Sequence, residues 1–457
     1  MTVKIINYNT DPDKLCGIAG FTSVSQEGYR ELLEKISPEK AKTVLGNIIK
    51  LGHHSVIEHG IFTIAFENIS AMFHQYLIEH RLASYTVRSK RYVNYSNVGH
   101  YVPSFFKYKP QLEKEFEEHV AFLSESYKKL VDAGIPTEDA RFVLPFCTFD
   151  NIICTINARE LAHFIYGCMY GHGRPYSEVR KAGEALLDQA KEIAPVIFDD
   201  INLFEHEESK KEEQLRGLFP DKSVPKLPEK KVDLLYCTEN PDDKIATIAT
   251  MNHLQVDADT AKELMHGKKT GVVNIICRNK RKREFEHANF TLRINKISLS
   301  VLTHLTRHRM QSLTIPKFTE VNMFYGNVLP KTISGKPELL EIYKATIDKT
   351  HELYKRFKGD GVPREVLSYL YQCGNLVSVV MTINARELHH FFRLRCCNRA
   401  QWEIQELADD ILKEVKQKAP LIFEGAGSTC VIGNCPERNK TCGKMMDQRA
   451  KYQDMGK

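Results

Sequence analysis

The 457-residue sequence has no uncharged apolar run that approaches the roughly 18 residues of a membrane-spanning helix. Its start, Met1–Asn7, also has none of the long apolar segment that is typical of a signal peptide. The 12 cysteines are scattered along the chain, whereas secreted disulfide scaffolds are short and dense in cysteine. We therefore expect a cytoplasmic protein with reduced thiols and no membrane partner.

Glycine-rich phosphate loops are also missing, because neither a P-loop nor a G-x-G-x-x-G pattern occurs. A nucleotide would then have to be held by side chains. The net charge of +6 is too small to indicate nucleic-acid binding by itself. The basic run Arg278–Arg283 is open to two interpretations, a solvated loop or a phosphate contact. Nucleic acid is not the partner that this composition favours.

What the sequence does contain is an internal repeat. The phrase Thr-Ile-Asn-Ala-Arg-Glu-Leu occurs at Thr155–Leu161 and again at Thr382–Leu388. Two weaker echoes pair Glu79–Ser84 with Arg307–Ser312, and Asp11–Lys14 with Asn240–Lys244. Matching residues are 229 positions apart near Asp11, 228 apart near Glu79 and 227 apart near Thr155, so the two halves align almost without gaps. A repeat of this length indicates two fused domains and not a solenoid.

The hydrophobic content of 42% is enough for two cores in a chain of this length. The stretch His206–Lys231 is rich in charge and proline and has little apolar periodicity, which is typical of a linker. We predict repeat 1 at residues 1–205, a linker at 206–231, and repeat 2 at 232–457 with a cysteine-containing tail.

Each repeat is predicted to open with a short strand, Val3–Ile6 or Val232–Leu235, and to contain a further strand at Ile61–Phe66 or Ala288–Ile294. Amphipathic patterns predict helices over about Gln111–Asp132 and Leu339–Lys358. Each ends at a Gly-apolar-Pro turn, Gly134–Pro136 or Gly361–Pro363, that leads into another helix. The class is α+β with helices dominating.

Two clusters of side chains could carry chemistry. The first, Glu79–Tyr92, gathers arginines, serines and tyrosines, and guanidinium groups beside hydroxyls suit phosphate binding. In the second, a helix beginning near Arg386 would place Arg386, His390 and Arg393 on one side, which suits a planar anionic ligand. A solvated arginine face for the first and an intrahelical salt bridge between Arg399 and Glu403 for the second stay open as alternatives.

The order of these residues resembles the flavin-dependent thymidylate synthase family. Gln75 followed by Glu79-His80-Arg81-x-x-Ser84-x-x-x-x-Ser89-x-Arg91 is similar to that family's Arg-His-Arg-x-x-Ser-x-x-x-x-Ser-x-Arg signature. Asn384–Ile404 resembles its second block, and Gly52–His59 is similar to its flavin-contacting loop, whose end recurs at Phe285–His287. The resemblance covers nearly the whole chain apart from the linker and implies two tandem domains, each a small sheet packed with helices.

The resemblance implies synthesis of dTMP from dUMP, with methylenetetrahydrofolate as the carbon donor, FAD as the cofactor and NADPH as the reductant. It implies that dUMP is bound by Gln75, Ser89, Arg91 and Arg141, and that Arg395 binds and polarises the uracil as the catalytic residue. The residues that it assigns to FAD are His53, Ser55, His80, Arg81, Asn157 and Arg159 in repeat 1, and Arg307, His308, Arg309, Asn384, Arg386 and His390 in repeat 2. Members of the family are homotetramers whose sites draw on several subunits.

Repeat 1 departs from the pattern at several places, which include Thr86-Val87 instead of a polar pair and one extra residue between Gln75 and the motif. Glu79 stands where the family has its first arginine, and Cys168 occupies the position of Arg395. A cysteine there cannot supply a fixed positive charge.

Repeat 2 departs at the complementary places. Lys317 and Thr319 replace the serine and arginine of Ser-x-Arg, and Ser368 replaces Arg141. Arg281–Arg283 also stands where repeat 1 has His53–Ser55.

These departures favour composite sites, in which repeat 1 donates Ser89 and Arg91 while repeat 2 donates Arg395. Two chains would then form a homodimer that acts as a pseudo-tetramer with two competent and two degenerate sites. The alternative is a homologue that has lost catalysis and binds flavin or a nucleotide as a sensor or structural protein. A nucleic-acid-binding protein that uses Arg278–Arg283 is a third, weaker interpretation.

The C-terminal tail contains Cys430-x4-Cys435-x6-Cys442. Three cysteines do not complete a tetrahedral zinc site, and the spacing is not that of a C-x2-C pair. Structural or incidental thiols are the expected interpretation, and the sequence identifies neither a fourth ligand nor a metal site.

Overall fold

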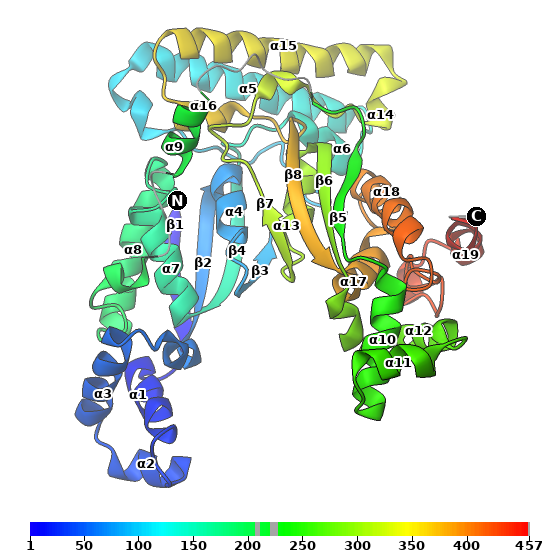
Figure 1. Ribbon diagram of the computed structural model, residues 1–457. Coiled ribbons are helices and arrows are strands. Elements are labelled where there is room, and N and C mark those ends of the chain that lie inside the picture. The colour runs from blue at the N-terminus through cyan, green and yellow to red at the C-terminus, as the bar shows by residue number, and fades with distance from the viewer. Residues whose placement is uncertain (206–210, 220–226, 456–457) are drawn as a thin grey trace. The chain divides into compact units, whose positions relative to one another are not determined.

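The computed structural model describes residues 1–205, 211–219 and 227–455. The chain divides into two compact units, which we call unit 1 (Met1–Pro225 with Leu329–Gly374) and unit 2 (Lys226–Val328 with Asn375–Lys457). Each unit contains one four-stranded antiparallel sheet with helices around it (Figure 1). The predicted α+β class with two small sheets is confirmed.

The sheet of unit 1 has the strand order β1-β2-β4-β3. Its strands are β1 (Thr2–Tyr8), β2 (Ile61–Ser70), β3 (Ala83–Val87) and β4 (Phe149–Asn157). The predicted strands at Val3–Ile6 and Ile61–Phe66 therefore lie in β1 and β2. Buried and less buried residues alternate along β4, as a strand with one face on the core requires.

The helices of unit 1 come from both predicted repeats. From the first they are α1 (Pro12–Thr22), α2 (Tyr29–Lys35), α3 (Pro38–Lys50), η1 (His54–His59), α4 (Ala71–Ile78), η2 (Ser104–Tyr108), α5 (Pro110–Asp132), α6 (Thr137–Ala140), η3 (Arg141–Val143), α7 (Ala158–Met169), α8 (Ser177–Ile193) and η4 (Ile201–Phe204). From the second they are α14 (Lys331–Ser334), α15 (Pro337–Gly359), α16 (Arg364–Leu367) and η7 (Ser368–Leu370). Residues 206–210 and 220–226 of the predicted linker lie outside the described residues, and α9 (Lys211–Leu218) lies between them.

The two long predicted helices are confirmed as α5 and α15. They pack on each other inside unit 1, where His119 Nε2 lies 3.0 Å from Thr350 Oγ1. Gly134 and Gly361 follow them with φ values of +80° and +75°, the left-handed conformation that glycine adopts without a steric cost. The chain then enters α6 and α16, as predicted. Residues 329–374, which belong to repeat 2 in the sequence, thus pack as part of unit 1. The boundaries of the compact units therefore differ from those of the predicted repeats, and the repeat boundaries stay a prediction.

Unit 2 repeats the architecture, with strand order β5-β6-β8-β7. Its strands are β5 (Val232–Cys237), β6 (Asn289–Ser298), β7 (Gln311–Thr314) and β8 (Leu376–Asn384). Its helices are α10 (Pro241–Leu254), α11 (Ala258–Met265), α12 (Lys269–Arg278), η5 (Arg283–His287), α13 (Leu299–Thr306), η6 (Met323–Tyr325), α17 (Ala385–Arg395), α18 (Trp402–Lys418), η8 (Arg438–Lys440) and α19 (Met445–Asp454).

A buried glutamate joins two helices in the same way in each unit. Glu178 accepts hydrogen bonds from the backbone N–H of Ser70 at 2.7 Å and from its hydroxyl at 2.6 Å. Glu403 makes the same two bonds to Ser298, at 2.7 and 2.6 Å. Both serines also cap the N-terminus of the helix that follows them, α4 or α13. The repeats therefore share buried polar contacts as well as topology.

All 12 cysteines lie in the described residues, and none is paired in a disulfide. Within residues 1–205, 211–219 and 227–455, no helix has the length and apolar character needed to cross a membrane.

We predict that Glu178 makes stability depend on pH. Burial raises the pKa of Glu178 from 4.5 to about 7, although the Ser70 bonds oppose the shift. The folded chain therefore keeps this proton over a range in which the unfolded chain has released it. The free energy of unfolding should fall by about 3 kcal/mol as pH rises from about 4.5 to about 7, and then level off.

Urea unfolding at several pH values, with Glu178→Gln as the control, measures this contribution. The variant has no ionisable group at position 178, so its stability should vary less with pH than that of the wild type over this window. Parallel pH profiles for the two proteins would contradict the prediction.

Candidate functional site

The segment that follows β3 carries Ser89 and Arg91 and lies against the short helix α6. Arg91 Nε donates to Glu138 Oε2 at 2.8 Å, and Arg141 Nε donates to the backbone carbonyl of Glu138 at 3.1 Å. Ser89 Oγ accepts a hydrogen bond from the backbone N–H of Arg91 at 3.2 Å. The structure thus brings the predicted trio Ser89, Arg91 and Arg141 together around Glu138, a residue that sequence reasoning missed.

This group suits an anionic ligand. Arg91 pairs with the Glu138 carboxylate and Arg141 donates to the Glu138 backbone carbonyl, so both guanidinium groups lie beside one residue. The side chains of Arg91 and Glu138 are 19% and 29% exposed, which leaves their ion pair open to solvent on one side. An incoming phosphate could replace Glu138 as the partner of Arg91 and form charge-assisted hydrogen bonds of the same kind.

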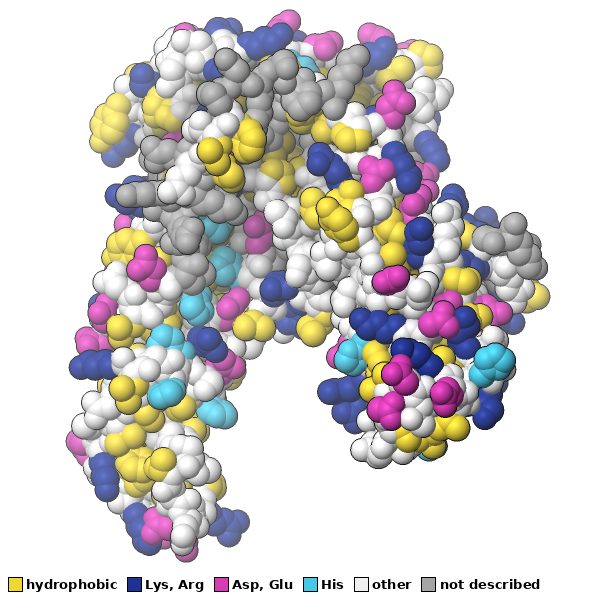
Figure 2. Space-filling view, viewed as in Figure 1, with side chains coloured by type: hydrophobic (Ala, Val, Ile, Leu, Met, Phe, Trp, Pro, Cys, Tyr) yellow, Lys and Arg dark blue, Asp and Glu magenta, His cyan; other side chains and the backbone are white. Residues whose placement is uncertain are grey.

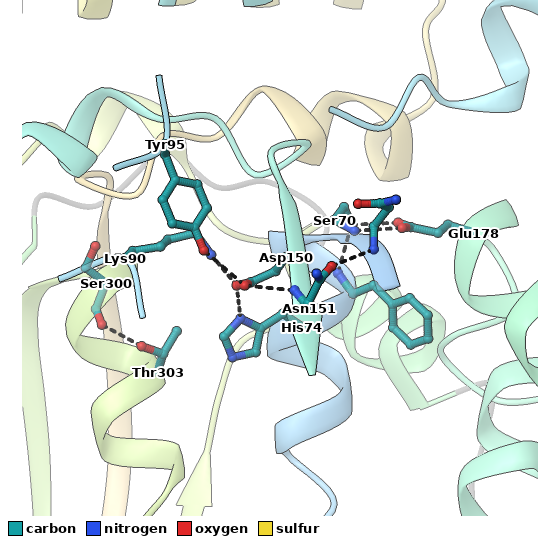
Figure 3. A network of polar contacts seen from close by, with 11 residues as sticks. Ser70, His74, Lys90, Tyr95, Asp150, Asn151, Glu178, Ser300 and Thr303 are labelled. Atoms are coloured by element: carbon teal, nitrogen blue, oxygen red, sulfur yellow. Dashed lines mark hydrogen bonds and ion pairs between the residues drawn. The ribbon is translucent and has the colours of Figure 1, made fainter. Parts of the chain in front are cut away.

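Lys90, between Ser89 and Arg91, points inward to a buried charge network (Figure 3). Its ammonium pairs with Asp150 of β4, whose side chain is fully buried. Asp150 also lies 2.8 Å from His74 Nδ1 and accepts a hydrogen bond from the Tyr95 hydroxyl at 3.1 Å. Burial alone would raise the pKa of Asp150, but Lys90 and His74 outweigh burial and hold that pKa well below its usual range. The ionised network therefore anchors the Ser89–Arg91 segment to the sheet.

Repeat 2 has replaced this whole network with apolar side chains. The corresponding turns are equivalent, because the carbonyls of Ser89 and Lys317 each accept backbone N–H bonds from the residues three and four positions later. Other positions of the two repeats correspond in the same way: Ser70 and Ser298 both cap a helix, and Asn157 and Asn384 both end a strand. The counterparts of His74, Lys90, Tyr95 and Asp150 are Leu302, Phe318, Met323 and Val377, which are 0%, 7%, 1% and 2% exposed. The repeat that lacks Ser-x-Arg also lacks its anchor.

Gln75 lies on α4, one position after His74, and is fully buried. Its Nε2 donates to Glu79 Oε1 at 3.0 Å. Burial raises the pKa of Glu79, and the bond from Gln75 opposes the rise. The predicted ligand Gln75 is therefore engaged with Glu79, the residue that replaces the first arginine of the motif.

The predicted cofactor residues of unit 1 gather at the start of α7. Asn157 caps this helix by accepting from the N–H of Glu160 at 2.9 Å. Arg159 pairs with Glu58 of η1 at 2.8 Å, which ties α7 to the loop that contains His53 and Ser55, both exposed. Figure 2 shows histidine side chains grouped on the visible face of unit 1.

The turn after α4 completes this group. The ring of His80 packs edge-on against Phe164 of α7, with centroids 4.9 Å apart. Arg81 is exposed, and the N–H of Leu82 lies 3.4 Å from Glu160 Oε1. The end of α4 therefore lies against the first turns of α7.

Unit 2 has the same arrangement around α17, with one addition. Asn384 caps α17, Arg386 pairs with Glu286 of η5, and the ring of His308 packs edge-on against Phe391 at 4.9 Å. The addition is Arg395, whose Nε donates to His308 Nε2 at 3.0 Å and whose other guanidinium nitrogen lies 3.3 Å from the His304 carbonyl.

The hydrogen bonds define the protonation of His308. Because Nε2 accepts from Arg395, the ring proton must lie on Nδ1, which is 3.4 Å from Glu387 Oε1. Burial lowers the pKa of His308, with Glu387 opposing the shift and Arg395 adding to it, so the neutral ring is favoured. A neutral His308 is thus a stable acceptor that orients the Arg395 guanidinium.

His308, Glu387 and His390 also form a group of metal-type ligands whose atoms lie within 4.8 Å of one another. The surroundings favour an anion over a cation. Arg395 already occupies His308 Nε2, and Arg307, Arg309 and Arg386 are exposed beside the group in the sequence. We therefore interpret this cluster as part of an anion-binding site.

The basic run Arg278–Arg283 is only partly a solvated surface. Lys282 donates to the carbonyl of Ile276 at 3.2 Å and also contacts the carbonyl of Cys277, so it caps the C-terminus of α12. Burial lowers the pKa of Lys282. Arg281 and Arg283 are exposed, and Figure 2 shows lysine and arginine side chains over the α10–α12 region.

Comparison with known proteins identifies the family. The model of the family described as "Thymidylate synthase complementing protein" matches residues 4–196 and again residues 233–421. This chain belongs to that family. The two matches also agree with the internal repeat, since each match covers one sheet and its helices.

Individual relatives match about half of the chain. It is similar to a flavin-dependent thymidylate synthase of Geobacter sulfurreducens, with 34% identity over 230 residues, 49% of this chain and 99% of the relative. A flavin-dependent thymidylate synthase of Clostridium tetani is 30% identical over 241 residues, 49% of this chain and 96% of the relative. Among solved structures, the UMP/dUMP methylase PolB of Streptomyces cacaoi aligns with 22% identity and a TM-score of 0.38, over 44% of this chain and 95% of that one.

The two family domains of this chain differ at Cys168 and Arg395, which occupy the same position of α7 and α17. Cys168 is fully buried, and a Cβ built on Gly183 of α8 would lie only 2.6 Å from the Cys168 Cβ. The close crossing of α7 and α8 therefore leaves no room for a long cationic side chain in the thymidylate synthase complementing domain of repeat 1. Arg395 is half-buried and held by His308.

The second family domain lacks the anion-binding trio in structure as well as in sequence. Thr319 Oγ1 lies 3.5 Å from Glu320 Oε1, and the Ser368 hydroxyl donates to the backbone carbonyl of Glu365 at 2.7 Å. Neither side chain can replace the guanidinium of Arg91 or Arg141.

We predict that the Asp150 network can be exchanged only as a whole. Asp150→Asn should lower the free energy of unfolding by about 3 kcal/mol, because Lys90 and His74 lose their buried counter-charge. Substituting all four positions with the repeat 2 residues (His74→Leu, Lys90→Phe, Tyr95→Met and Asp150→Val) should leave stability within about 1 kcal/mol of the wild type, or raise it.

Urea unfolding of the two variants beside the wild type measures this. If the fourfold variant is as unstable as Asp150→Asn, the apolar set of repeat 2 does not fit unit 1, and the proposed equivalence of the two clusters is wrong.

Proposed function

We propose that this protein is an FAD-dependent thymidylate synthase that converts dUMP to dTMP, with methylenetetrahydrofolate as carbon donor and NADPH as reductant. The observation that carries the proposal is complementary loss. Repeat 1 gathers Ser89, Arg91 and Arg141 and has a buried cysteine in place of the cation, whereas repeat 2 holds Arg395 in a fixed orientation and has Lys317, Thr319 and Ser368 in place of the trio. The family and the names of its relatives support the reaction.

In this proposal the anion-binding trio holds the phosphate of dUMP. Arg91 would exchange its ion pair with Glu138 for one with the phosphate, and Arg141, 5% exposed, would provide a second guanidinium from a fixed position. Lys90 stays bound to Asp150 and keeps the segment in place. Gln75 lies on the neighbouring helix and would contact the nucleotide by exchanging its bond to Glu79.

Arg395 would act on the uracil. A guanidinium that is oriented before the substrate binds can stabilise negative charge that develops on a ring carbonyl without a cost of reorganisation. Neutral His308 and the His304 carbonyl provide that orientation. No protein nucleophile is required, because bound FAD, once reduced, supplies the hydride.

The residues present fit a flavin dinucleotide. Arg307, Arg309 and Arg386 in unit 2, and Arg81 and Arg159 in unit 1, supply guanidinium groups next to the capped starts of α17 and α7. Diphosphate oxygens are suitable partners for such groups. In this proposal His53, Ser55, His80 and His390 would contact the rest of the cofactor, while Asn157 and Asn384 cap the helices that carry Arg159 and Arg386.

We further propose that each competent site combines repeat 1 of one chain with repeat 2 of another. Two chains supply four repeats and so could form a homodimer equivalent to a tetramer of single domains. Two sites would contain both the trio and Arg395, and two would contain neither. The alternative, a homologue that binds flavin or nucleotide without synthesis, predicts a flavin-bound protein that cannot rescue a thymidine-requiring bacterial strain.

We predict separate effects at the two positions. Arg91→Ala should weaken dUMP binding about 10- to 100-fold through loss of a charge-assisted bond. Arg395→Ala should lower kcat on the order of 100-fold or more with a smaller effect on dUMP affinity. Calorimetric titration with dUMP and steady-state assays measure the two quantities.

The chain offers a matched control for each variant. Thr319→Ala, at the counterpart of Arg91, should leave dUMP affinity unchanged, and Cys168→Ala, at the counterpart of Arg395, should leave kcat unchanged if the mutant folds normally. If Arg91→Ala and Arg395→Ala both leave dUMP binding and turnover unchanged, the assigned roles are wrong.

We predict that the two impaired variants complement each other. When Arg91→Ala and Arg395→Ala chains are co-expressed, one site of every mixed dimer regains both native residues. With random pairing, and at a dUMP concentration too low to saturate Arg91→Ala, the mixture should recover about a quarter of wild-type activity, well above either variant alone. Activity no higher than that of the separate variants would contradict sites shared between chains.

A further inference from the structure

The tail between α18 and α19 is held in a defined conformation with little apolar burial. Between Gly425 and Lys444 the tail contains one short helix, the three-residue η8. The buried apolar side chains of this segment are those of Ala426, Cys430 and Val431. Arg449 of α19 donates to the carbonyls of Cys430 and Gly433, at 3.0 Å each. A short segment with so small a core is of the kind that metals or disulfides commonly stabilise.

Contacts of its neighbours Asn398 and Arg399 bring the backbone at a fourth cysteine, Cys397, close to this tail. Cys397 follows the end of α17, and its neighbour Asn398 places its side-chain Nδ2 3.7 Å from Cys442 Sγ. The Cys397 sulfur itself accepts from the backbone N–H of Arg399 at 3.5 Å. The backbone at Cys397 and the tail are also joined by Arg399, whose Nε donates to the Lys440 carbonyl at 2.7 Å.

A chain of polar contacts connects two of the thiols, those of Cys442 and Cys430. From Cys442 it runs through the amide of Asn398 to Gln448, with a 3.0 Å bond from Gln448 Nε2 to Asn398 Oδ1. Ser428 then donates to Gln448 Oε1 at 3.1 Å and lies 3.3 Å from Cys430 Sγ. Side chains of this kind around sulfur atoms resemble the outer shell that orients metal ligands.

One divalent ion bound by four thiolates leaves a net negative charge at the site. The tail also carries Arg438, Lys440 and Lys444, whose charges would offset the excess of four thiolates over one divalent ion.

We propose that Cys397, Cys430, Cys435 and Cys442 bind one Zn²⁺ in a tetrahedral structural site. Four thiolates and no open position form a closed ligand set for zinc. Among the described residues, the four sulfur atoms do not form a group whose ligand atoms lie within 4.8 Å of one another, so binding of zinc would require the segment with Cys435 and Cys442 to move toward Cys397. The four thiols release their protons to solvent as they bind the ion.

Such a site would pin the end of α17. Cys397 is two residues beyond Arg395, and Thr429 of the tail lies within 3.4 Å of the Arg393 carbonyl. Zinc would therefore fix the tail to the helix that carries the proposed catalytic arginine. The inference does not rest on the proposed function, because it concerns the thiols alone.

Metal content of the full-length chain tests the proposal. Protein expressed with added zinc sulfate and purified under reducing conditions should contain about one zinc per chain by mass spectrometry. Exchange for Co²⁺ should give the absorption bands of tetrahedral thiolate coordination. Cys397→Ser and Cys442→Ser should each lose the zinc, whereas Cys237→Ser, a half-buried thiol of the same unit, should retain it.

Two further measurements keep the test decisive if a cysteine variant folds poorly. Thiol modification of the wild type should release zinc to a chromogenic chelator, and Glu387→Gln should retain the zinc. Loss of zinc from Glu387→Gln, retention of zinc by Cys397→Ser, bound iron in place of zinc, absence of zinc from the wild type, or a disulfide among the four cysteines would each overturn the proposal.

Discussion

The register of the central strand pair is the constraint on which both units depend. In unit 1, β2 and β4 pair antiparallel from Ile61 opposite Asn157 to Ser70 opposite Phe149, and the hydroxyls of Thr63 and Thr155 meet across the ladder at 3.2 Å. This register places Asn157 at one end of β4, where it caps α7, and Asp150 near the other, where it anchors Lys90. Side chains alternate along a strand, so a slip of one residue would turn Asp150 out of the interior and misplace the cap.

The same scaffold carries two different solutions for its interior. In unit 1 a buried carboxylate satisfies a lysine, a histidine and a tyrosine, which is costly in desolvation and demands correct geometry. Unit 2 fills the corresponding positions with leucine, phenylalanine, methionine and valine. The charged solution accompanies the Ser89–Arg91 segment, which needs a defined position to meet an anion. Where that segment has lost its charged partners, ordinary packing is sufficient.

A similar exchange separates Cys168 from Arg395. A buried thiol lets α7 and α8 approach closely, whereas a half-buried arginine needs an acceptor, which His308 provides. The difference is consistent with a division of work between the repeats, in which one contributes anion binding and the other contributes a fixed positive charge. His80 and His308 pack against equivalent phenylalanines, Phe164 and Phe391, in the two units. The exchange of cysteine for arginine at positions 168 and 395 therefore gives different chemistry to otherwise similar surroundings.

The sequence by itself determined the repeat, the α+β class, the positions of the long helices and principal strands, and the loss of a cation at Cys168. These features follow from local patterns and from the comparison of one half with the other. Glu138, the partners of Asp150, the acceptor of Arg395 and the approach of Cys397 to the tail were decided only by the tertiary structure. Asp150 gave a weak signal, as the one acidic residue of its strand, but its partners lie 60 and 76 positions away. Sheet register and chain reversal, not sequence spacing, determine which distant side chains are buried together, and burial is what makes their pairing obligatory.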